Sequence, residues 1–596
     1  MKKYQKCYPS EVSMKSLFLG PKAENSSWLL EQMLGILNNW FLWRKKLNPY
    51  DGPAVSAFDQ NLKEFINKQN FVSENLKHLA ALFEKEVPQF SPRYIGHMFS
   101  EVNLPALLGH FISLLHNPNI ISHESAKVGI KIENEAIGWL NQMIGFKGNH
   151  GHFTSGGTVA NFESLIRSKE RIFLWALMLA TENQVLKTKN ELWQTSSCGW
   201  KRFHKLFLKK EIRRQFQKSL KELNSSESKR IYFKEMFGTQ NNDPVVLIPQ
   251  HKHYSWMKGC SFIGLDPEQV RYLDLDADGK VDLKKLDRDL GELKKENRPI
   301  QMIVSVFGTT ELGFVDPIDK ILQLLKKNKV PNTWCHIDGA FGGFFATLKT
   351  EPKLFTQKAF QSLKAMKLAT SVTIDPHKMG YVPYSSGAFL CAHREDYYLQ
   401  SFFGPYVVYE EKVDRGPYTL EGSRPGTGAT AMWMTAKSIP LNSQGLGQII
   451  KRTLRTKKDL EILLRESHPG IRIAHSTDLN ILCFCLASEG DSFLSVNKKT
   501  KSLLNKMAKK KEGFIVSQTI LKYESYSAYI EKLSQQWKCN NEQSQKKDLM
   551  LIRVTVMNPF FDSKEFKINF KKEFVNFVLK NIDEGSKAKS HKERKG

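Results

Sequence analysis

The sequence predicts an α/β protein, with a mostly parallel central sheet covered by helices on both faces and a smaller α+β domain after it. Its 596 residues exceed what one hydrophobic core usually spans, and 41% are hydrophobic. From about Ser122 onward, short apolar runs alternate with helical patterns, which is typical of βαβ units. We expect a helical N-terminal segment over residues 1–120, a large α/β domain over 121–440 and a small domain over 441–596.

The N-terminal segment is predicted to be helical. From Trp28 to Leu47, apolar residues recur at helical spacing, so this stretch should pack on another subunit or on the main body. A second helical stretch runs to about Pro88, and an irregular loop around His97 follows. His97 is a candidate pocket residue, although a hydrogen-bonded structural histidine fits the pattern equally well.

The charge of the chain is strongly positive, at +27. Basic residues are densest in Lys201–Lys234 and in the tail Lys587–Lys595, but no ladder of alternating basic and aromatic residues accompanies them. We therefore expect a solvated basic surface and no nucleic-acid partner. The longest apolar run, Ile172–Ala180, is about half the length of a membrane-spanning helix, so no membrane span is expected either.

The cysteines and the N-terminus indicate a reducing, cytoplasmic location. Residues 1–10 lack the apolar core of a secretory signal. The eight cysteines, Cys7 among them, are scattered along the chain. Alternation would place Cys483 and Cys485 on one face of a buried strand, so neither a disulfide nor a metal site is expected.

A glycine-rich helix start is the first candidate ligand-binding feature. Gly156, Gly157 and Thr158 open a helix that continues through Leu165. Small residues there let backbone N–H groups approach an anion, and the helix dipole favours phosphate. Glycine also begins many helices that bind nothing. The following stretch, about 167–242, is predicted to form basic amphipathic helices inserted into the α/β body.

The next strand, Val245–Pro249, ends in a segment with two histidines, His251 and His253, on either side of Lys252. A metal site would need a carboxylate or cysteine at ligand spacing, and the segment has none. We therefore expect the aromatic residues around these histidines to form a pocket wall.

Two further strands end in polar residues. Ile300–Phe307 leads into a turn that contains Thr309, and the run from Thr333 ends in Asp338 followed by small residues. Ligands bind at the carboxyl ends of strands in open parallel sheets. An acid at such a position can be a buried counter-ion, and a surface-capping aspartate is the alternative.

The segment Thr373–Tyr381 is predicted to be a short strand that enters a proline-containing turn and presents His377 and Lys378. Desolvation on a stiff turn lowers the pKa of an amine towards the range where it attacks carbonyl groups, which a Schiff base requires. An exposed loop lysine is the alternative. Beyond it, the glycine-rich and aromatic span Phe402–Gly428 is either a lid or a long surface connection.

Five motifs together resemble those of the group II pyridoxal-phosphate-dependent amino-acid decarboxylases, and most closely the bacterial tyrosine decarboxylases. The resemblance covers most of residues 15–440 and returns at Arg553–Pro559. The motifs, in chain order, are S-G-G-T, K-H-Y-S-W, F-G-T-T-E-L-G, H-I-D-G-A-F-G-G and D-P-H-K-M-G-Y, joined by F-L-G-P-K-A-E-N, S-P-R-Y-I-G-H-M and P-Y-S-S-G.

The resemblance implies fold type I of the pyridoxal-phosphate enzymes, the aspartate aminotransferase-like fold. It also implies that Lys378 forms the internal aldimine with pyridoxal 5'-phosphate and that Asp338 pairs with the protonated pyridine nitrogen. His253 would stack on the cofactor ring and Thr309 would sit beside it. The remaining cofactor contacts implied are Gly156, Gly157 and Thr158 around the phosphate, with His377 near the phosphate or the substrate.

For the substrate, the resemblance implies that Arg553, five residues before Asn558, holds the carboxylate, with His97 as a further pocket residue. Tyr384 occupies the position of the tyrosine that protonates the quinonoid. A tyrosine on the span after Phe402 is the competing donor.

The implied reaction is decarboxylation of an aromatic L-amino acid, and the conversion of tyrosine to tyramine is the favoured case. The resemblance also implies a homodimer whose active sites lie at the subunit interface. The segment Ser423–Gly426 also resembles sphingosine-phosphate lyases, so such a lyase or a glutamate decarboxylase is an alternative. Outside enzymes, the alternative is an inactive relative that binds anionic partners through its basic surface.

Overall fold

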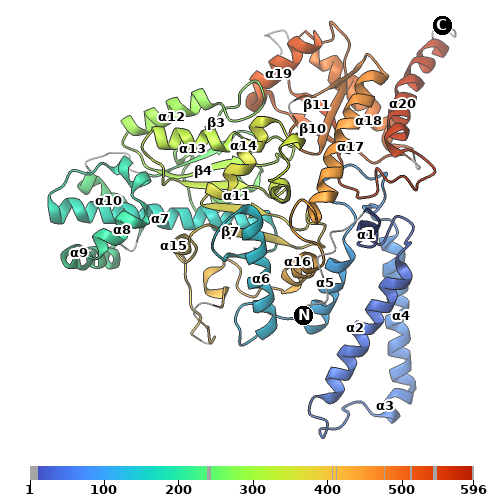
Figure 1. Ribbon diagram of the computed structural model, residues 1–596, viewed down its shortest axis with the longest axis horizontal. Helices are drawn as coiled ribbons and strands as arrows, with labels where there is room; N and C mark the ends of the chain where they lie inside the picture. Colours follow the sequence, from blue (N-terminus) through green and yellow to red (C-terminus); the bar gives the residue numbers. More distant parts are fainter. Residues whose placement is uncertain are drawn as a thin grey trace.

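The computed structural model describes residues 11–223, 225–237, 243–405, 407–410, 413–475, 477–510, 513–540 and 547–592. Cys7, Tyr406 and the last residues of the basic tail, 593–596, lie outside this range. A seven-stranded sheet and a four-stranded sheet lie side by side in the molecule (Figure 1). A helical arm projects from this body.

The larger sheet has the strand order β1-β7-β6-β5-β4-β2-β3. Strands β6, β5, β4, β2 and β3 run parallel to one another. Strand β7 pairs antiparallel with both β6 and β1. The mostly parallel sheet predicted from the sequence is confirmed. Its strands are β1 (His150–Thr154), β2 (Val245–Pro249), β3 (Val270–Leu273), β4 (Ile300–Val306), β5 (Trp334–Asp338), β6 (Ser371–Ile374) and β7 (Gly387–Cys391).

Helices cover both faces of this sheet because successive residues of a buried strand point to opposite sides. Val245 and Leu247 of β2 pack with helices α12 (Leu283–Lys295) and α13 (Ile318–Lys327). Val246 and Ile248 pack on the other face with α7 (Gly157–Leu186) and α11 (Ser255–Phe262). The other helices of this region are α6 (Lys127–Ile144), α14 (Gln357–Ala365), α15 (Arg394–Tyr397) and α16 (Thr427–Ser438).

The smaller sheet is antiparallel, in the order β10-β11-β9-β8. On β9, Leu482 and Phe484 face one helical layer, whereas Cys483 and Cys485 face the opposite side, so the thiols share one face of a buried strand as predicted. The elements are α17 (Leu446–Ser467), β8 (Ile471–Ile473), β9 (Ile481–Leu486), α18 (Phe493–Ala508), β10 (Ser517–Leu521), α19 (Tyr523–Trp537), β11 (Leu549–Thr555) and α20 (Phe570–Lys592).

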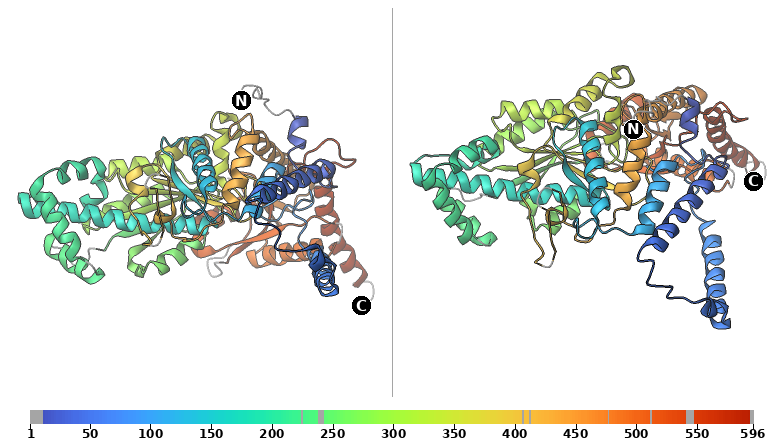
Figure 2. Two further views of the ribbon diagram at one scale, coloured as in Figure 1. Left: turned by 90° about the horizontal axis from the view of Figure 1, so that it is seen from below. Right: turned by 60° about the horizontal axis from the view of Figure 1, so that its bottom comes forward.

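A helical arm, residues 26–83, projects from the body (Figures 1 and 2). No residue of its helices is buried within the described chain. The ring of Trp43, near the end of α2, contacts that of His116 on α5 at 5.1 Å, so the first helix of the arm touches the body there. The N-terminal elements are α1 (Glu11–Lys15), α2 (Ser26–Lys46), α3 (Ala57–Asn61), α4 (Lys63–Phe83) and α5 (Leu104–His116).

The basic insertion begins later than predicted. Helix α7 continues unbroken to Leu186, and its Arg167 and Arg171 are buried. Arg167 pairs with Glu163, and Arg171 lies 3.3 Å from Asp396, so residues 167–186 belong to the sheet-covering helix. Helices α8 (Gly199–Phe207), α9 (Lys210–Glu222) and α10 (Ser226–Phe237) then form a subdomain with a core of its own, at one end of the molecule (Figure 1). None of the helices in the described ranges is both long and apolar enough to cross a membrane.

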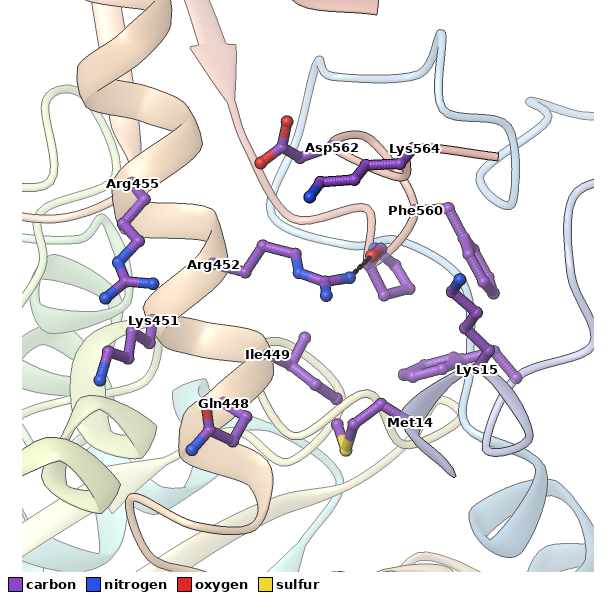
Figure 3. Close-up of a pocket in the computed structure, with 12 residues that line it drawn as sticks. Met14, Lys15, Gln448, Ile449, Lys451, Arg452, Arg455, Phe560, Asp562 and Lys564 are labelled. Carbon is purple, nitrogen blue, oxygen red and sulfur yellow. Dashed lines mark hydrogen bonds between the residues drawn. The ribbon is translucent and has the colours of Figure 1, made fainter. Parts of the chain in front are cut away.

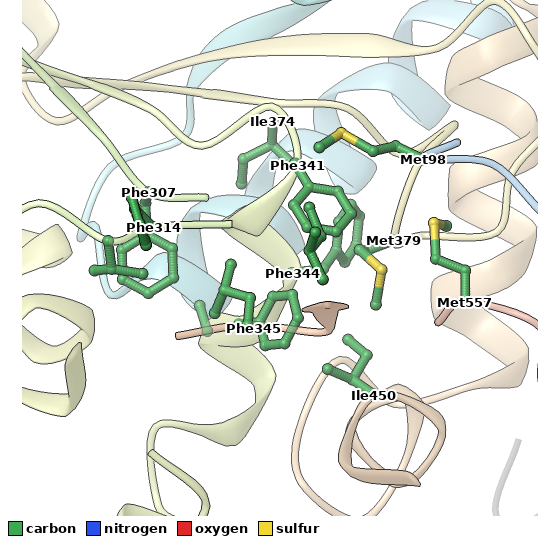
Figure 4. Close-up of a cluster of buried hydrophobic side chains, with 14 of the residues drawn as sticks. Met98, Phe307, Phe314, Phe341, Phe344, Phe345, Ile374, Met379, Ile450 and Met557 are labelled. Carbon is green, nitrogen blue, oxygen red and sulfur yellow. The ribbon is translucent and has the colours of Figure 1, made fainter. Parts of the chain in front are cut away.

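The turn after β6 is held in place by the main hydrophobic core. Met379 is completely buried against Phe341 and Phe344 (Figure 4). At Gly380, a side-chain Cβ would lie 2.5 Å from the carbonyl oxygen of Pro376, so only glycine fits. The following Tyr381 has the left-handed φ of 56° and is buried. The turn that carries Lys378 is therefore rigid, unlike an exposed loop.

Glu101 holds the segment that precedes the arm against the body. Its Oε1 accepts a hydrogen bond from the backbone N–H of Gly20 at 3.1 Å, and its Oε2 is buried without a partner among the described residues. Burial raises the pKa of Glu101 to about 7, and the nearby Glu24 raises it further. The carboxyl group is therefore a source of pH-dependent stability.

We expect Glu101→Gln to raise the thermal unfolding midpoint at pH 8 and to leave it unchanged near pH 5. A folded-state pKa above the unfolded value of 4.5 means that protonation stabilises the fold: the stability is fully present below pH 4.5 and is lost as pH rises through 7. The loss amounts to at most about 3 kcal/mol. Thermal melts of both proteins at the two pH values measure it, with Glu74→Gln on the exposed surface of α4 as control. An equal effect at both pH values would contradict the assignment.

Candidate active site

A cavity of about 190 Å³ opens at the carboxyl ends of β2, β4, β5 and β6. All the residues that the sequence assigned to a cofactor line it, whereas Tyr384, Arg553 and His97 do not. The lining residues are Gly156, Gly157, Thr158, Asn161, His251, His253, Val306, Gly308, Thr309, Thr310, Asp338, Ala340, Phe341, Asp375, His377 and Lys378.

Lys378 lines this cavity, with its side chain 20% exposed, beside an acid that the sequence reasoning did not assign. Its Nζ lies 3.0 Å from Oδ2 of Asp375, three residues earlier in the chain. Burial lowers the pKa of the amine, but the carboxylate of Asp375, assisted by Asp338, outweighs burial, so the pKa of Lys378 is raised. Burial does lower the pKa of Lys378, as predicted, but the predicted net lowering is wrong, because the turn places an anion against the amine.

Asp338 is fixed at the end of β5 by hydrogen-bond donors. Its Oδ2 accepts hydrogen bonds from Nδ2 of Asn161 and Nε1 of Trp256, both at 3.0 Å. The backbone N–H of Ala340 donates to Oδ1 at 3.3 Å. In the sheet register Asp338 is opposite Thr373, so the acid lies beside the strand that leads to Lys378. A cationic group entering the cavity would meet an oriented carboxylate.

The start of α7 leaves an open cradle. A Cβ at Gly157 would lie 2.9 Å from Oδ2 of Asp375, and a Cβ at Gly156 would have Cε1 of His377 as its nearest neighbour, at 3.7 Å. The absence of side chains thus leaves room between α7 and the turn after β6. The first N–H groups of a helix lack intrahelical partners, so they and the helix dipole can receive an anion here.

His253 is linked to Asp338 through two side chains. Its Nδ1 lies 2.9 Å from Oγ of Ser255, which in turn accepts a hydrogen bond from Nδ2 of Asn161 at 3.1 Å. Asn161 also donates to Asp338. Burial lowers the pKa of His253, which favours the neutral imidazole. A neutral ring on this wall presents an aromatic face to the cavity, in agreement with the predicted pocket wall.

His251 and Thr309 occupy other walls. Nε2 of His251 lies 2.9 Å from Oδ1 of Asp316, and its Nδ1 is buried with no partner within the described ranges. Burial lowers the pKa of His251, but the carboxylate of Asp316 outweighs burial and raises it. Oγ1 of Thr309 accepts a hydrogen bond from the backbone N–H of Phe314 at 3.0 Å, which fixes the turn after β4.

The three predicted residues that do not line the cavity are joined by a row of aromatic rings outside it. The ring of Tyr384 stacks on that of His377, with centroids 4.2 Å apart, and meets Phe99 edge-on at 6.4 Å. Phe99 stacks on His97 at 5.9 Å. Nδ1 of His97 lies 3.0 Å from an NH2 nitrogen of Arg553. Burial, assisted by Arg553, lowers the pKa of His97, so its neutral ring can accept this hydrogen bond.

The span from Phe402 to Gly428 divides into two parts. Phe402 and Val408 in its first half are exposed, and Tyr406 lies outside the described residues. In the second half, Arg424 is buried and pairs with Glu133 at 2.6 Å. Arg424 belongs to the S-R-P-G segment that resembles sphingosine-phosphate lyases. In this structure its guanidinium forms a buried ion pair with Glu133.

Tyr409 and Tyr418, the described tyrosines of this span, contact other aromatic rings and do not line the cavity. Tyr409 meets Phe403 edge-on at 5.6 Å, and Tyr418 meets Tyr398 at 4.4 Å. The ring of Tyr384, in contrast, contacts the lining residue His377 directly.

Sequence reasoning missed four residues of the cavity region. Asp375 stands in the same D-P-H-K motif as the lysine, and Asn161 lies one helical turn after Gly157, so both signals were present. Trp256 was expected only as a wall residue, but it donates to the acid of β5. His251 was set aside with the rejected metal site.

The lining residues fit pyridoxal phosphate. The glycine cradle at the start of α7 has room for a phosphate group, and a buried amine lies beyond it. Oδ1 of Asp375 is buried with no partner among the described residues, so this oxygen could accept a hydrogen bond from a bound group. The oriented acid at the end of β5 matches a protonated pyridine nitrogen.

Comparison with known proteins agrees with this chemistry. Residues 213–487 match the family model described as the pyridoxal-dependent decarboxylase conserved domain. The chain is 26% identical to the L-tyrosine decarboxylase of Enterococcus faecium, with 96% of the chain and 99% of the relative covered. It is 27% identical to the L-tyrosine decarboxylase of Levilactobacillus brevis, with 93% and 94% covered. An aspartate 1-decarboxylase of Aliivibrio fischeri is 25% identical, with 70% and 68% covered.

Solved structures share the fold. The crystal structure of Catharanthus roseus tryptophan decarboxylase in complex with L-tryptophan has a TM-score of 0.60 at 14% identity, covering 94% of this chain and 99% of that one. Mouse CSAD in apo form has a TM-score of 0.59 at 17% identity, covering 94% and 98%. The predicted fold class is thereby confirmed.

Proposed function

We propose that the chain is a pyridoxal-phosphate-dependent amino-acid decarboxylase of group II. Its substrate would be an aromatic L-amino acid, most favourably tyrosine, which it converts to the amine. The similarity to L-tyrosine decarboxylases over nearly the whole length of both chains carries this proposal. The similarity to the aspartate decarboxylase covers only about two thirds of either protein.

The row of rings outside the cavity supports an aromatic side chain. It leads from His377, which lines the cavity, through Tyr384, Phe99 and His97 to Arg553. A substrate whose carboxylate meets Arg553 would lie along these rings. Aromatic rings pack favourably edge-to-face or offset-stacked, so tyrosine gains contacts that glutamate or aspartate does not.

The proposed roles follow from position. Bound pyridoxal phosphate supplies an electron sink for the electron pair that departing carbon dioxide leaves. Lys378 would bind the aldehyde, after transfer of its proton to Oδ2 of Asp375 at 3.0 Å. Asp338 would keep a proton on the ring nitrogen, and His253 would face the ring. The start of α7, at Gly156, Gly157 and Thr158, would hold the phosphate, with Thr309 and His377 on the neighbouring walls.

On the substrate side, Arg553 would hold the carboxylate and His97 would orient the guanidinium through their 3.0 Å contact. Tyr384 would donate the proton that replaces carbon dioxide, because its ring contacts His377 beside the cavity. The side of the cavity where Tyr384 lies is open in the described chain, and 54% of Tyr384 is exposed. A covering element from a second copy would exclude water from this proton transfer.

A panel of amino acids tests the proposed substrate. The holoenzyme would be incubated with tyrosine, phenylalanine, tryptophan, glutamate and aspartate, and released carbon dioxide and amine measured for each. We expect kcat/KM for tyrosine to exceed that for either acidic amino acid by at least about a hundredfold, because their carboxylates would enter an aromatic surface unpaired. A preference for an acidic amino acid would overturn the substrate class.

We also propose that the chain works as a homodimer and that a second copy covers the arm. Large apolar side chains of α2 and α4 are exposed, among them Trp43 at 50%, Phe71 at 62% and Leu76 at 60%. A contiguous exposed apolar surface of this kind marks an interface. Homodimers bury such self-complementary surfaces about a twofold axis.

We expect the wild-type protein to sediment as a dimer and Leu76→Glu/Leu79→Glu on α4 to shift it to monomer or aggregate. Each glutamate would bring an unpaired charge into an apolar contact, at a cost of several kcal/mol for the pair. Sedimentation velocity over a range of protein concentrations measures the change. Gln69→Glu, which adds one charge at an exposed polar position of the same helix, is the control; a dimer that survives the double substitution would rule out this surface.

A further inference from the structure

A second cavity, of about 300 Å³, lies between α17, α1 and the segment after β11 (Figure 3). It is larger than the cavity at the sheet edge and reaches the lower limit of small-molecule sites, about 300 Å³. Among the described residues, none lines both cavities. The second cavity is therefore a separate place where a ligand could bind.

The floor of this cavity is apolar and firmly packed. Phe18, Ile449 and Phe560 line it and are each at least nine-tenths buried. The rings of Phe18 and Phe560 meet edge-on with centroids 6.0 Å apart. A flat or chain-like apolar group would find ready contacts on this floor.

The rim is basic. Arg452 extends from α17 towards the opposite wall, where it reaches the carbonyl oxygen of Pro559 at 3.4 Å (Figure 3). Arg455 and Lys564 also line the cavity, and neither has an ion-pair or hydrogen-bond partner within the described ranges. The remaining basic lining residues are Lys15 and Lys451.

The acids around the cavity neutralise only part of this charge. Lys15 pairs with Glu565, and Lys451 lies 3.3 Å from Glu351. Asp562, the acid found among the described lining residues, is 2.7 Å from Lys571 outside the lining. The cavity thus retains an excess of positive charge, with guanidinium and ammonium groups above an apolar floor.

We propose that this cavity binds a small organic phosphate, with its aromatic or acyl body on the floor of Phe18, Ile449 and Phe560 and its phosphate between Arg455 and Lys564. Guanidinium groups match the oxygens of a phosphate in geometry. A phosphate carries nearly two negative charges at neutral pH, which suits several cations better than a carboxylate does.

The cavity also contacts the turn that carries Lys378. The ring of Phe18 meets that of Tyr381 edge-on at 5.7 Å, and the hydroxyl of Tyr381 donates to the carbonyl oxygen of Met557 at 2.8 Å. The backbone N–H of Tyr381 donates to the carbonyl oxygen of Lys378 at 3.1 Å. A ligand that shifts Phe18 would therefore act on the active-site turn, a consequence that rests on the proposed role of Lys378.

Calorimetric titration of the holoenzyme with phenyl phosphate tests the binding. Pyridoxal phosphate already fills the main cavity, and loss of binding in a variant of the second cavity distinguishes that cavity from the proposed substrate site. We expect a dissociation constant of the order of 0.1–1 mM, as suits a ligand of this size. Binding should weaken at least about tenfold in Arg455→Glu/Lys564→Glu and should be unchanged in Arg465→Glu, an exposed position further along α17.

Two comparisons make the titration decisive. Inorganic phosphate, which lacks the apolar body, and phenylacetate, which carries a carboxylate, should both bind several-fold more weakly than phenyl phosphate. Equal affinity for either probe, or undiminished binding in Arg455→Glu/Lys564→Glu, would overturn the proposal. Retained cofactor absorbance in that variant verifies that it is folded.

The visible absorbance of the bound cofactor tests the contact with the turn. Phenyl phosphate should shift this band in the wild type and in Arg465→Glu but not in Arg455→Glu/Lys564→Glu. Binding without any shift would overturn the coupling through Phe18. Because calorimetry needs no turnover, failure of the amino-acid panel and failure of this proposal are separate results.

Discussion

Replacing Lys378 by alanine should reduce decarboxylation at least about a thousandfold, the loss expected when the group that bonds covalently to the cofactor is removed. The amine lines the cavity at the carboxyl ends of the strands, and the described residues lining that cavity contain no other lysine. The protein should also lose the yellow colour of the linked cofactor. Steady-state assays and absorbance spectra of the purified variant measure both effects.

A chemical test locates the linkage directly. Borohydride reduction of the wild-type holoenzyme should fix the cofactor to the peptide that contains Lys378, identified by mass spectrometry after digestion. Lys364→Ala, an exposed lysine on α14 of the same domain, is the matched control and should keep colour and activity. Cofactor fixed to a different lysine would contradict the assignment.

The sequence predicted four strands of the large sheet, β2, β4, β5 and β6, and the residues that it assigned to a cofactor all line the cavity. The apolar run Val245–Pro249 fits a strand buried on both faces, and Trp334–Asp338, although it contains His336 and Asp338, is buried in the same way. The carboxyl ends of such parallel strands meet at one edge of the sheet. Asp338 and Lys378 therefore come together in the structure as expected from the order of the strands. The glycines at the start of α7 were only a weak candidate anion site from the residues, since glycine begins many helices that bind nothing, and the motif resemblance assigned them to the cofactor phosphate.

Charged residues were the main source of error. Arg167 and Arg424 were assigned to a basic insertion and to a lid or connection, because arginines are mostly exposed. Both are buried in ion pairs, with Glu163 and Glu133. Paired and solvated arginines look the same in a sequence, since the partner is supplied by tertiary packing.

The second cavity lay beyond the reach of sequence reasoning for a related reason. Its walls come from residues 14–18, 448–455 and 559–564, which are far apart in the chain. No one of these segments carries a recognisable motif for an anion. Only the packing of α1 against α17 and the segment after β11 brings their basic residues over one apolar floor.

Two acids flank Lys378, and their expected roles differ. Asp375 touches the amine at 3.0 Å and raises its pKa, whereas Asp338 is held at the strand end by Asn161 and Trp256. One acid is therefore placed to exchange a proton with the amine, and the other to fix a proton on the ring nitrogen. Substituting each acid separately distinguishes these roles.

Asp338→Asn should lower kcat by about a hundredfold to ten-thousandfold while the cofactor remains bound and linked. Asparagine has nearly the same shape and can still accept from Asn161 and Trp256, but it cannot stabilise a positive charge on the ring nitrogen in a buried site. Turnover of the preferred amino acid and the absorbance of the linked cofactor measure the two quantities in one sample.

Asp375→Asn is the comparison for this result. It removes the anion that raises the pKa of Lys378, so linkage of the cofactor should extend to lower pH, and kcat at pH 7 should fall less than in Asp338→Asn. Titration of the visible band from pH 5 to 9 follows the first effect. If Asp375→Asn lost more turnover than Asp338→Asn with the linkage intact, the acid paired with the ring nitrogen would be Asp375, because only the loss of that pairing impairs the electron sink itself.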